Sequence, residues 1–293
     1  MKVFVTGASG FIGSAVVIEL IKAGHQVIGL ARSEKSASKI KAAGAEVLMG
    51  ELEDLNVLKK GASEADGVIH TAFFHDFTQF TKATEIDKKA ITAMGEALKG
   101  TTKPLIVTAG ILGLPKIDGV ITEKSVSQNS PRASEITGLA LAEANINVSV
   151  IRLPPSVHDK NDGGFIPFII HQARKHGVSA YLGEGKNRWP AVHRLDAAKI
   201  FCLALEKAEK GALYNAIGDE GIEIKMIAEI IGNELNLPVR SLSEDAALKH
   251  FEWMFGFIGF DSPAKAVKTK EILKWNPVNI GLIEDMKKHY FNL

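Results

Sequence analysis

The first thirteen residues constrain the fold of this chain more than any other segment. Residues 2–6 carry no charge after Lys2 and predict a strand, Gly7, Gly10 and Gly13 follow at once, and residues 14–23 predict a helix. One glycine permits the tight turn, one lets a phosphate approach the backbone, and one lets the helix pack close to the strand. The helix N-terminus adds a partial positive charge. The segment therefore predicts an α/β fold whose first turn binds a pyrophosphate, and a tight turn without a ligand is the alternative.

Strands and helices alternate beyond this turn. The apolar pattern predicts strands over residues 26–30, 46–49, 67–70, 105–108 and 148–153, and helices over residues 35–43, 53–60, 80–99 and 130–145. Strands that alternate with helices form a parallel sheet through right-handed crossovers. We expect a doubly wound α/β sheet with a ligand crevice at the carboxyl ends of its strands.

The pattern changes after residue 153, where Pro154-Pro155 and Gly163-Gly164 interrupt it. We expect a Rossmann domain over residues 1–153, to which later segments return, and a smaller substrate lobe over residues 154–293. The strongly apolar stretch 253–260 is expected in the core of this lobe, with a substrate wall or an interface as the alternative. Helices are expected over residues 165–175, 191–208, 225–236, 244–254 and 263–273, and a strand over residues 212–216.

The charge balance and the cysteine count narrow the range of partners. The 293 residues include 35 Lys and Arg against 34 Asp and Glu, which does not favour a nucleic-acid partner. No apolar run is long enough to span a membrane, and the single Cys202 cannot form an internal disulfide. The histidines lack metal-ligand spacing, so we expect no metal site. A cytoplasmic location is the simplest interpretation.

Six motifs occur in order along the chain: TGASGFIG at residues 6–13, GEL at 50–52, HTA at 70–72, RLPPSV at 152–157, WPAVHRLDAA at 189–198 and EILKWNP at 271–277. They resemble the TGxxGxxG, GDL, HxA, nicotinamide-loop, VHVDDLA and LGWxP segments of extended and atypical short-chain dehydrogenases/reductases, which are similar to NAD-dependent epimerases and dehydratases. The resemblance covers nearly the whole chain. It implies a Rossmann fold that binds a nicotinamide dinucleotide.

The resemblance also implies which residues contact this cofactor. The first turn corresponds to the pyrophosphate site, residues 50–52 to the adenine site, and residues 152–157 to the segment that closes over the nicotinamide. The implied contacts are Gly7, Ser9, Gly10, Phe11, Ile12, Gly13, Glu51, Leu52, Thr71, Ala72, Thr108, Arg132, Pro154, Pro155, Ser156 and Val157.

The end of the second expected strand bears on the choice between NADP and NAD. A carboxylate normally accepts the ribose 2′-hydroxyl at this place, whereas this chain has Arg32 and Ser33. A guanidinium binds a 2′-phosphate through bidentate, charge-assisted hydrogen bonds. We therefore expect NADP, with NAD as the alternative. In the second case Arg32 is a solvated loop residue and Ser33 only caps the next helix.

The resemblance implies a catalytic tyrosine with a lysine four residues later, and this pair is absent. Tyr181, Tyr214 and Tyr290 all lack a lysine at that spacing. By spacing, Gln128 stands at the tyrosine position and Arg132 at the lysine position. A glutamine amide can only donate a hydrogen bond, whereas an arginine can stabilise an oxyanion but is a poor proton donor.

Other side chains could polarise a substrate oxygen or move a proton. Thr108 ends the fifth expected strand and matches the family's Ser/Thr that bonds a substrate carbonyl. Histidines titrate near neutral pH, and His75, His158 and His193 lie in segments expected near the crevice. Thr108 could instead bond nearby backbone, and His193 could cap a helix.

A basic and aromatic group lies in the segment after residue 187. Arg188, Trp189 and Arg194 could meet a carboxylate or phosphate of a substrate, or could anchor the two lobes to each other. The expected substrate contacts are Phe73, His75, His158, Arg188, Trp189 and His193.

Two functions of different classes are consistent with these features. The first is an NADP-dependent reductase or dehydrogenase of a small carbonyl or hydroxyl substrate, in which Arg132 and Thr108 polarise the oxygen and a water or a histidine supplies the proton. An epimerase or isomerase suits the same fold. The second is a nicotinamide-nucleotide-binding redox sensor or regulatory protein without turnover, which the missing Tyr–Lys pair favours. A homodimer is a possible assembly.

Overall fold

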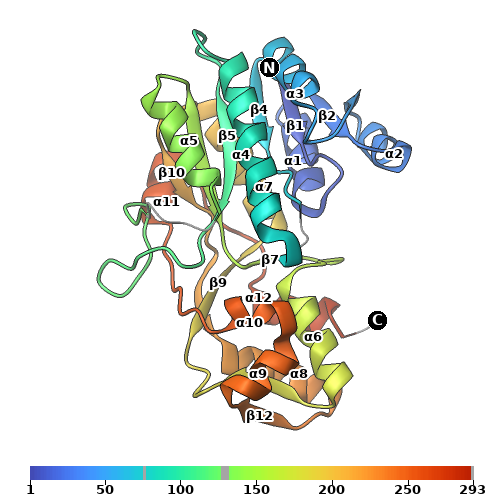
Figure 1. The fold of residues 1–293 in the computed structure, drawn as a ribbon, viewed down its shortest axis with the longest axis vertical. Helices are drawn as coiled ribbons and strands as arrows, with labels where there is room; N and C mark the ends of the chain where they lie inside the picture. Colours follow the sequence, from blue (N-terminus) through green and yellow to red (C-terminus); the bar gives the residue numbers. More distant parts are fainter. Residues whose placement is uncertain (75–76, 127–131, 292–293) are drawn as a thin grey trace.

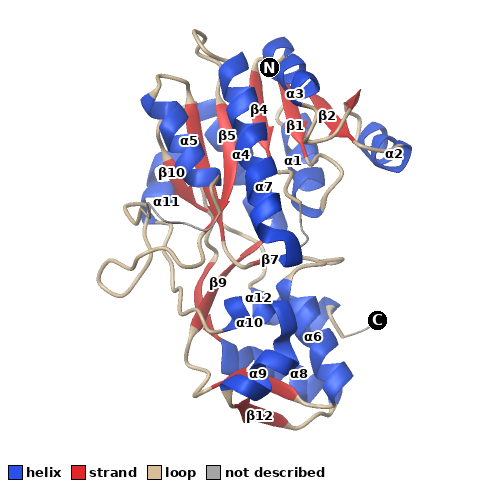
Figure 2. Cartoon of the chain, viewed as in Figure 1, coloured by secondary structure: helices blue, strands red, loops and turns tan. Residues whose placement is uncertain are grey.

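The computed structural model describes residues 1–74, 77–126 and 132–291 (Figure 1). Its larger part is a parallel sheet with helices on both faces, and its smaller part is mostly helical with short strands (Figure 2). The N-terminus lies in the larger part, and the last described residues lie in the smaller part. Two predicted site residues, His75 and Gln128, lie outside the described residues.

The larger part contains a seven-stranded sheet in the order β10-β6-β5-β4-β1-β2-β3, and every pairing in it is parallel. The chain starts at β1, winds outward to β3 and then crosses back to β4, so the strand order reverses between β1 and β4. A ligand crevice forms at such a switch point, outside the carboxyl ends of the strands. The strands are β1 (Lys2–Thr6), β2 (Gln26–Ala31), β3 (Glu46–Met49), β4 (Gly67–His70), β5 (Leu105–Gly110), β6 (Val148–Leu153) and β10 (Leu213–Asn215).

Both faces of this sheet are buried, which explains its nearly continuous apolar strands. In β1, Val3 and Val5 pack into one core while Phe4 packs into the other. The helices on the Val3 side are α1 (Phe11–Lys22), α2 (Glu34–Ala42), α7 (Arg194–Lys207) and α11 (Val267–Leu273). The helices on the Phe4 side are α3 (Leu55–Glu64), α4 (Phe80–Ala97) and α5 (Ser134–Glu143), with the short 3-10 helix η1 (Phe77–Gln79) before α4.

The smaller part has its own apolar core, built mainly from isoleucines of α6 and α8 with Phe251 and Met286. Two small sheets complete it, β11-β9-β7 and β12-β8. Across the described ranges, no helix combines the length and apolarity needed to cross a membrane. The elements of the smaller part are β7 (Ser156–His158), α6 (Phe165–His176), β8 (Ser179–Leu182), β9 (Arg188–His193), β11 (Asp219–Glu223), α8 (Ile224–Leu235), β12 (Val239–Leu242), α9 (Glu244–Phe251), η2 (Glu252–Met254), α10 (Phe255–Ile258) and α12 (Leu282–His289).

Several boundaries differ from the sequence-based expectation because of long-range pairing. Residues 191–193 lie in strand β9 rather than in a helix, since they pair with β7 and β11. Residues 263–266 are not helical either, because the Pro263 carbonyl accepts from the Ile121 amide and Ala264 bridges Ile121. Helix α5 begins only at Ser134. Strands β7, β8, β11 and β12 were not expected, because their pairing partners lie far away in the chain.

Candidate functional site

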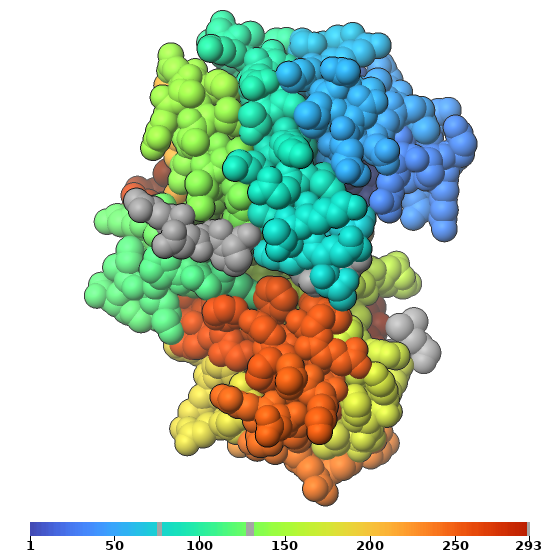
Figure 3. Space-filling view, viewed as in Figure 1, coloured from blue at the N-terminus to red at the C-terminus, as the bar shows by residue number. Residues whose placement is uncertain are grey.

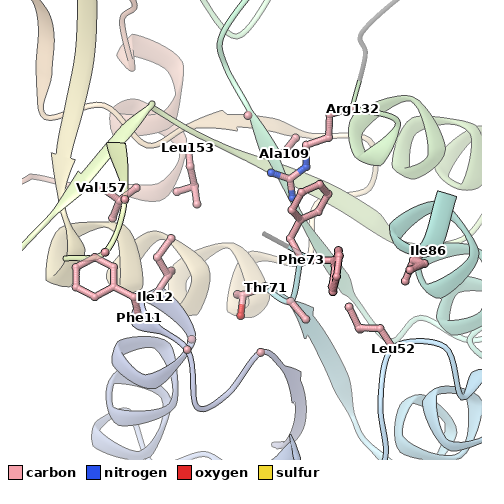
Figure 4. Close-up of a pocket in the computed structure, with 18 of the residues that line it drawn as sticks. Phe11, Ile12, Leu52, Thr71, Phe73, Ile86, Ala109, Arg132, Leu153 and Val157 are labelled. Carbon is pink, nitrogen blue, oxygen red and sulfur yellow. The ribbon is translucent and has the colours of Figure 1, made fainter. Parts of the chain in front are cut away.

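One cavity of about 790 Å³ lies between the carboxyl ends of the central strands and the smaller lobe. Its volume falls within the roughly 300–1,000 Å³ of ordinary ligand sites. Figure 4 shows Ile12 and Phe11 of α1 on one side of it, with Arg132 and Phe73 on another. The predicted cofactor residues that line it are Gly7, Ser9, Gly10, Phe11, Ile12, Gly13, Arg32, Glu51, Leu52, Thr71, Ala72, Arg132, Pro154, Pro155 and Val157.

The glycine turn presents bare backbone to this cavity. Gly7 has φ +71°, and a Cβ built on Gly13 lies 2.1 Å from the Gly7 carbonyl oxygen, so both positions exclude a side chain. The Gly10 amide donates to the same carbonyl at 2.8 Å, and Gly10 caps helix α1 without any side-chain bond to the first turn. The first amides of α1 therefore keep unused N–H groups, which suit a pyrophosphate.

The wall next to the second strand carries a cation. Arg32 follows β2, is exposed, lines the cavity and makes no ion pair with the described residues. Ser33 does not line the cavity, because its hydroxyl accepts from the Ser36 amide at 3.2 Å and caps helix α2. Ser36 lines the cavity instead. The structure thus places Arg32 with Ser36, rather than with Ser33, at this wall.

A buried polar chain leads from β1 to Arg132. The Thr6 hydroxyl and His70 Nδ1 lie 2.7 Å apart, and His70 Nε2 lies 3.0 Å from the Asp87 carboxylate. The Ser134 hydroxyl donates to the other Asp87 oxygen and accepts from Arg132 Nε at 2.8 Å. The guanidinium lies 4.2 Å above the centre of the Phe73 ring, at the cavity (Figure 4). This series of hydrogen bonds holds the Arg132 guanidinium in one orientation at the cavity.

The charged groups of this hydrogen-bonded series shift each other's pKa values. Burial alone raises the pKa of Asp87, but the hydrogen bond and charge of His70, the charge of Arg132 and the Ser134 hydrogen bond hold that pKa below its usual value. Burial lowers the pKa of Arg132, and the charge of Asp87 opposes this shift. An arginine remains protonated in proteins, so the site keeps its positive charge.

Thr108 lies beside the site but does not line the cavity. Its hydroxyl donates to the His70 carbonyl at 2.7 Å, and its own carbonyl accepts from Arg132 Nη2 at 3.2 Å. Ser156 is also buried and absent from the lining. Thr108 therefore bonds backbone and helps to orient Arg132, as in the alternative of a strand-end threonine, and its contact with a substrate carbonyl stays a prediction.

The predicted histidines serve protein contacts rather than the cavity wall. His158 is buried and lies 2.7 Å from Asp285, and burial lowers its pKa despite that carboxylate. His193 Nδ1 accepts from the Leu195 amide at 3.2 Å and caps helix α7. Neither lines the cavity. Their contact with a substrate therefore stays a prediction, while the cap alternative describes the bond that His193 makes.

Of the basic and aromatic group, Arg194 connects the two lobes, whereas Arg188 and Trp189 make contacts within the smaller one. Arg194 binds Asp159 at 2.9 Å, donates to the Phe11 carbonyl at 3.3 Å and stacks on the Phe11 ring at 4.9 Å. Arg188 pairs with Asp261 through contacts of 3.0 and 3.1 Å. Trp189 is fully buried, and neither Trp189 nor Arg188 lines the cavity. Of the expected substrate contacts in the described residues, Phe73 is the one on the wall.

The structure adds an aromatic wall, one part of which belongs to the stretch 253–260 that was expected in the core. Phe165 and Phe168 of α6, Trp253 of η2 and Phe257 of α10 line the cavity and are half-buried. Their ring centres lie 4.7 to 5.8 Å apart in the pairs 168–253, 165–257 and 165–253. The apolar run 253–260 was the available signal, and its substrate-wall alternative matches the geometry.

Asp162 also lines the cavity and was not singled out from the sequence. Its carboxylate accepts from the Gly164 amide at 2.7 Å and from the Tyr290 hydroxyl at 2.8 Å. Burial raises the pKa of Asp162 to about 6, with a smaller contribution from the charges of Asp285 and Asp159. This carboxyl is ionised at neutral pH and protonated in mild acid.

A small group outside the cavity brings three possible metal ligands together. His25 Nε2 lies 3.1 Å from Glu206, and the Cys202 thiol lies 3.8 Å from the same carboxylate. Spacing in the sequence could not reveal this group, because His25 and Glu206 are far apart along the chain. Burial raises the pKa of Cys202 to about 12.

Comparisons with known proteins agree with this architecture. A model of the NmrA-like family matches residues 1–101. Uncharacterized protein C2A9.02 of Schizosaccharomyces pombe is 46% identical over 98% of each chain. A 4-hydroxy-2-methyl-3-oxo-4-farnesyl-3,4-dihydroquinoline-1-oxide ketoreductase of Stigmatella aurantiaca is 23% identical over 79% of this chain and 72% of its own. The structure of dTDP-glucose 4,6-dehydratase from Streptomyces venezuelae with NAD has a TM-score of 0.78 and 18% identity, covering 99% of this chain and 96% of its own.

Proposed function

We propose that this chain, whose residues 1–101 match the NmrA-like family and whose fold resembles that of NAD-binding epimerases and dehydratases, is an NADP(H)-dependent oxidoreductase of the short-chain dehydrogenase/reductase superfamily. Its substrate is a small carbonyl or hydroxyl compound. The observation that carries this proposal is one cavity that extends from the glycine turn and Arg32 to the guanidinium of Arg132. The ketoreductase relative supports a carbonyl substrate.

The residues of the first half of the cavity fit a dinucleotide phosphate. The bare turn at Gly7, Gly10 and Gly13 accommodates the pyrophosphate where a Cβ would intrude. Arg32 and Ser36 are placed to bond a ribose 2′-phosphate, since the guanidinium has no competing ion pair among the described residues. NADPH, when bound, supplies a hydride.

Arg132 orients and polarises the substrate oxygen. A guanidinium has five N–H donors, and Arg132 uses Nε for Ser134 and Nη2 for the Thr108 carbonyl. The remaining donors, including those of Nη1, make no hydrogen bond to a described residue and can donate to an oxygen in the cavity. Charge that develops on this oxygen is stabilised by a fixed, half-buried cation. His158 and His193 do not line the cavity, which leaves a water or His75, outside the described residues, as the proton source.

Calorimetric titration with NADPH and NADH, after removal of any bound nucleotide, tests the cofactor. Consumption of NADPH with a panel of aldehydes, ketones and quinones then tests the activity. We expect Arg132→Gln to lower turnover at least 100-fold while NADPH still binds. Arg174→Gln, on the exposed side of α6, is the charge-matched control. If neither nucleotide binds, or if Arg132→Gln turns over as the wild type does, the proposal is wrong.

One observation favours a second candidate function. Of the residues that the structure describes, no tyrosine or lysine lines the cavity, and the Thr108 hydroxyl is bonded to backbone. A nicotinamide-nucleotide sensor or regulatory protein without turnover needs neither group. In this case NADPH binds tightly and changes the protein's resistance to proteolysis, yet no member of the panel is reduced. An epimerase would interconvert its substrate without net use of NADPH.

The remaining sequence-based expectations stay predictions. We propose a small-molecule substrate, a cytoplasmic location and a homodimer, which fractionation of cells and light scattering of the purified protein test.

A further inference from the structure

We propose that the lobe side of the cavity selects uncharged, apolar carbonyl compounds with an aromatic or alkyl body, and rejects nucleotide sugars and other phosphorylated substrates. This inference rests on the proposed function, because it names the substrate class of that same site. The lobe side is defined here as the wall formed by Asp162, Phe165, Phe168, Trp253 and Phe257.

The four aromatic residues of the lobe side form one ordered surface. Trp253 contacts Phe168 with ring centres 4.7 Å apart, and Phe165 lies 5.8 Å from Trp253 and 5.5 Å from Phe257. Such tilted ring pairs hold each other in place, and all four residues line the cavity. Figure 3 shows this C-terminal segment, coloured orange, close beneath the cyan surface that includes α4. All four rings are half-buried, so the wall is not sealed in the core.

Apolar side chains of the larger part also face the cavity. Phe73, Phe74, Phe80 and Ile86 line it, and the Phe73 ring lies 6.3 Å from that of Phe80. Phe73 lies under the Arg132 guanidinium at 4.2 Å. A carbonyl oxygen bonded to Arg132 therefore has its carbon skeleton between two apolar walls.

The charges of the lining oppose an anionic substrate on the lobe side. Arg32, Glu51 and Glu53 line the opposite end, after strands β2 and β3, and Arg132 lies between the two ends. Among the described lobe-side residues, Asp162 is the ionisable one, and it is an acid.

The groups that face Asp162 do not reverse this sign. Gly164 and Tyr290 donate hydrogen bonds to it, and the nearby charges of Asp285 and Asp159 are also negative. Among the described residues, no lysine, arginine or histidine of this lobe lines the cavity, and Arg188 and Lys175 pair with Asp261 and Glu252. A diphosphate on the lobe side would lose its hydration and meet a carboxylate instead of a cation. An uncharged apolar group has no such hydration to lose and is not repelled by the carboxylate.

Calorimetry with defined probes tests the inference on the full chain saturated with NADP⁺, and in parallel on the chain without nucleotide. The probes are 2-acetylnaphthalene, an uncharged aryl ketone, and UDP-glucose. We expect 2-acetylnaphthalene to bind and UDP-glucose to bind at least 100-fold more weakly. In a series of methyl ketones from 2-butanone to 2-nonanone, the dissociation constant should fall by about fourfold per methylene.

Variants of the wall separate a ring contact from a general loss of stability. Trp253→Ala and Phe257→Ala should each weaken 2-acetylnaphthalene about tenfold, since ring contacts are worth about a factor of ten, with NADPH affinity unchanged. Phe260→Ala is the matched control, because Phe260 belongs to the same segment, is exposed and does not line the cavity. Trp253→Leu keeps apolar volume in place of the ring if the alanine variant does not fold.

The outcomes distinguish this inference from the proposed function. The inference is wrong, and the cofactor assignment stands, if NADPH binds but UDP-glucose binds as tightly as 2-acetylnaphthalene. The same holds if NADPH binds but the dissociation constant does not change along the series of methyl ketones. Equal affinities in the wild type, Trp253→Ala and Phe257→Ala would also overturn it. If NADPH does not bind while 2-acetylnaphthalene does, the proposed function fails and the selectivity of the wall stands.

Discussion

Replacement of Arg32 by alanine tests the cofactor assignment most directly. The guanidinium is exposed at the cavity wall, lies after β2 next to Ser36, and makes no ion pair with the residues that the structure describes. Its removal therefore breaks no internal ion pair and leaves no buried charge uncompensated. We expect the fold, the thermal stability and the binding of NADH to stay close to the wild type.

The expected loss for NADPH follows from the contact that Arg32 can make. A hydrogen bond to a charged group is worth about 1.5–3 kcal/mol, which corresponds to about 10- to 150-fold in the dissociation constant. Because the side chain is exposed, solvent and salt screen it, and the lower end of this range, about 10- to 30-fold, applies at 0.15 M salt. The ratio of NADPH to NADH affinity should fall by the same factor.

The assay is calorimetric titration of wild type, Arg32→Ala and Lys35→Ala with both nucleotides. Lys35 is exposed on α2 three residues from Arg32 and does not line the cavity, so Lys35→Ala removes the same charge without the contact. Only Arg32→Ala should change the ratio. An unchanged ratio, or equal changes in both variants, would refute the assignment of Arg32 to a 2′-phosphate.

Three further predictions concern the turn, the buried chain and the acid. Gly13→Ala places a Cβ 2.1 Å from the Gly7 carbonyl, so we expect loss of NADPH binding and a lower melting temperature, whereas Gly256→Ala, with open space around its Cβ, should be neutral in both assays. Ser134→Ala leaves an Asp87 oxygen and Arg132 Nε without their shared partner, so thermal unfolding should show a loss of about 1–3 kcal/mol, and an unchanged melting temperature would contradict the role of the chain. Folding raises the pKa of the Asp162 carboxyl from 3.8 to about 6. The stabilisation of the folded state by this carboxyl is therefore fully present below about pH 4 and is lost as the pH rises through 6. The loss in the free energy of unfolding is at most about 3 kcal/mol. Asp162→Asn should remove that loss, and parallel pH profiles of the melting temperature in wild type and variant would show that the shift is absent.

The sequence allowed the class of the fold, and most of the residues that line the glycine-turn end of the cavity, to be predicted. Strand β1, the turn and helix α1 are adjacent in the chain, so their roles follow from local pattern and from the steric freedom of Gly7 and Gly13. The same holds for Arg32 at the end of β2. The prediction for Ser33 was incomplete, because Ser33 caps α2 while Ser36, one helical turn later, lines the cavity.

The catalytic and substrate predictions were less successful, because they concerned polar side chains whose partners lie far along the chain. His158 pairs with Asp285, which is 127 residues away, and Arg188 pairs with Asp261, which is 73 residues away. Thr108 bonds the His70 carbonyl on the neighbouring strand. Residue type shows that a side chain can do chemistry, but not whether another part of the protein already occupies it.

By itself the sequence determined that this protein forms an α/β sheet with a bare glycine turn and a cation at the end of β2, because periodicity and backbone freedom are local properties. Tertiary structure alone decided which groups face the cavity. It turned His158, His193 and Arg188 into structural contacts, and it brought Phe165 together with Trp253 and Phe257 from distant segments. The physical reason is that burial and pairing depend on the packed neighbours of a side chain, and these neighbours exist only once the two lobes have folded against each other.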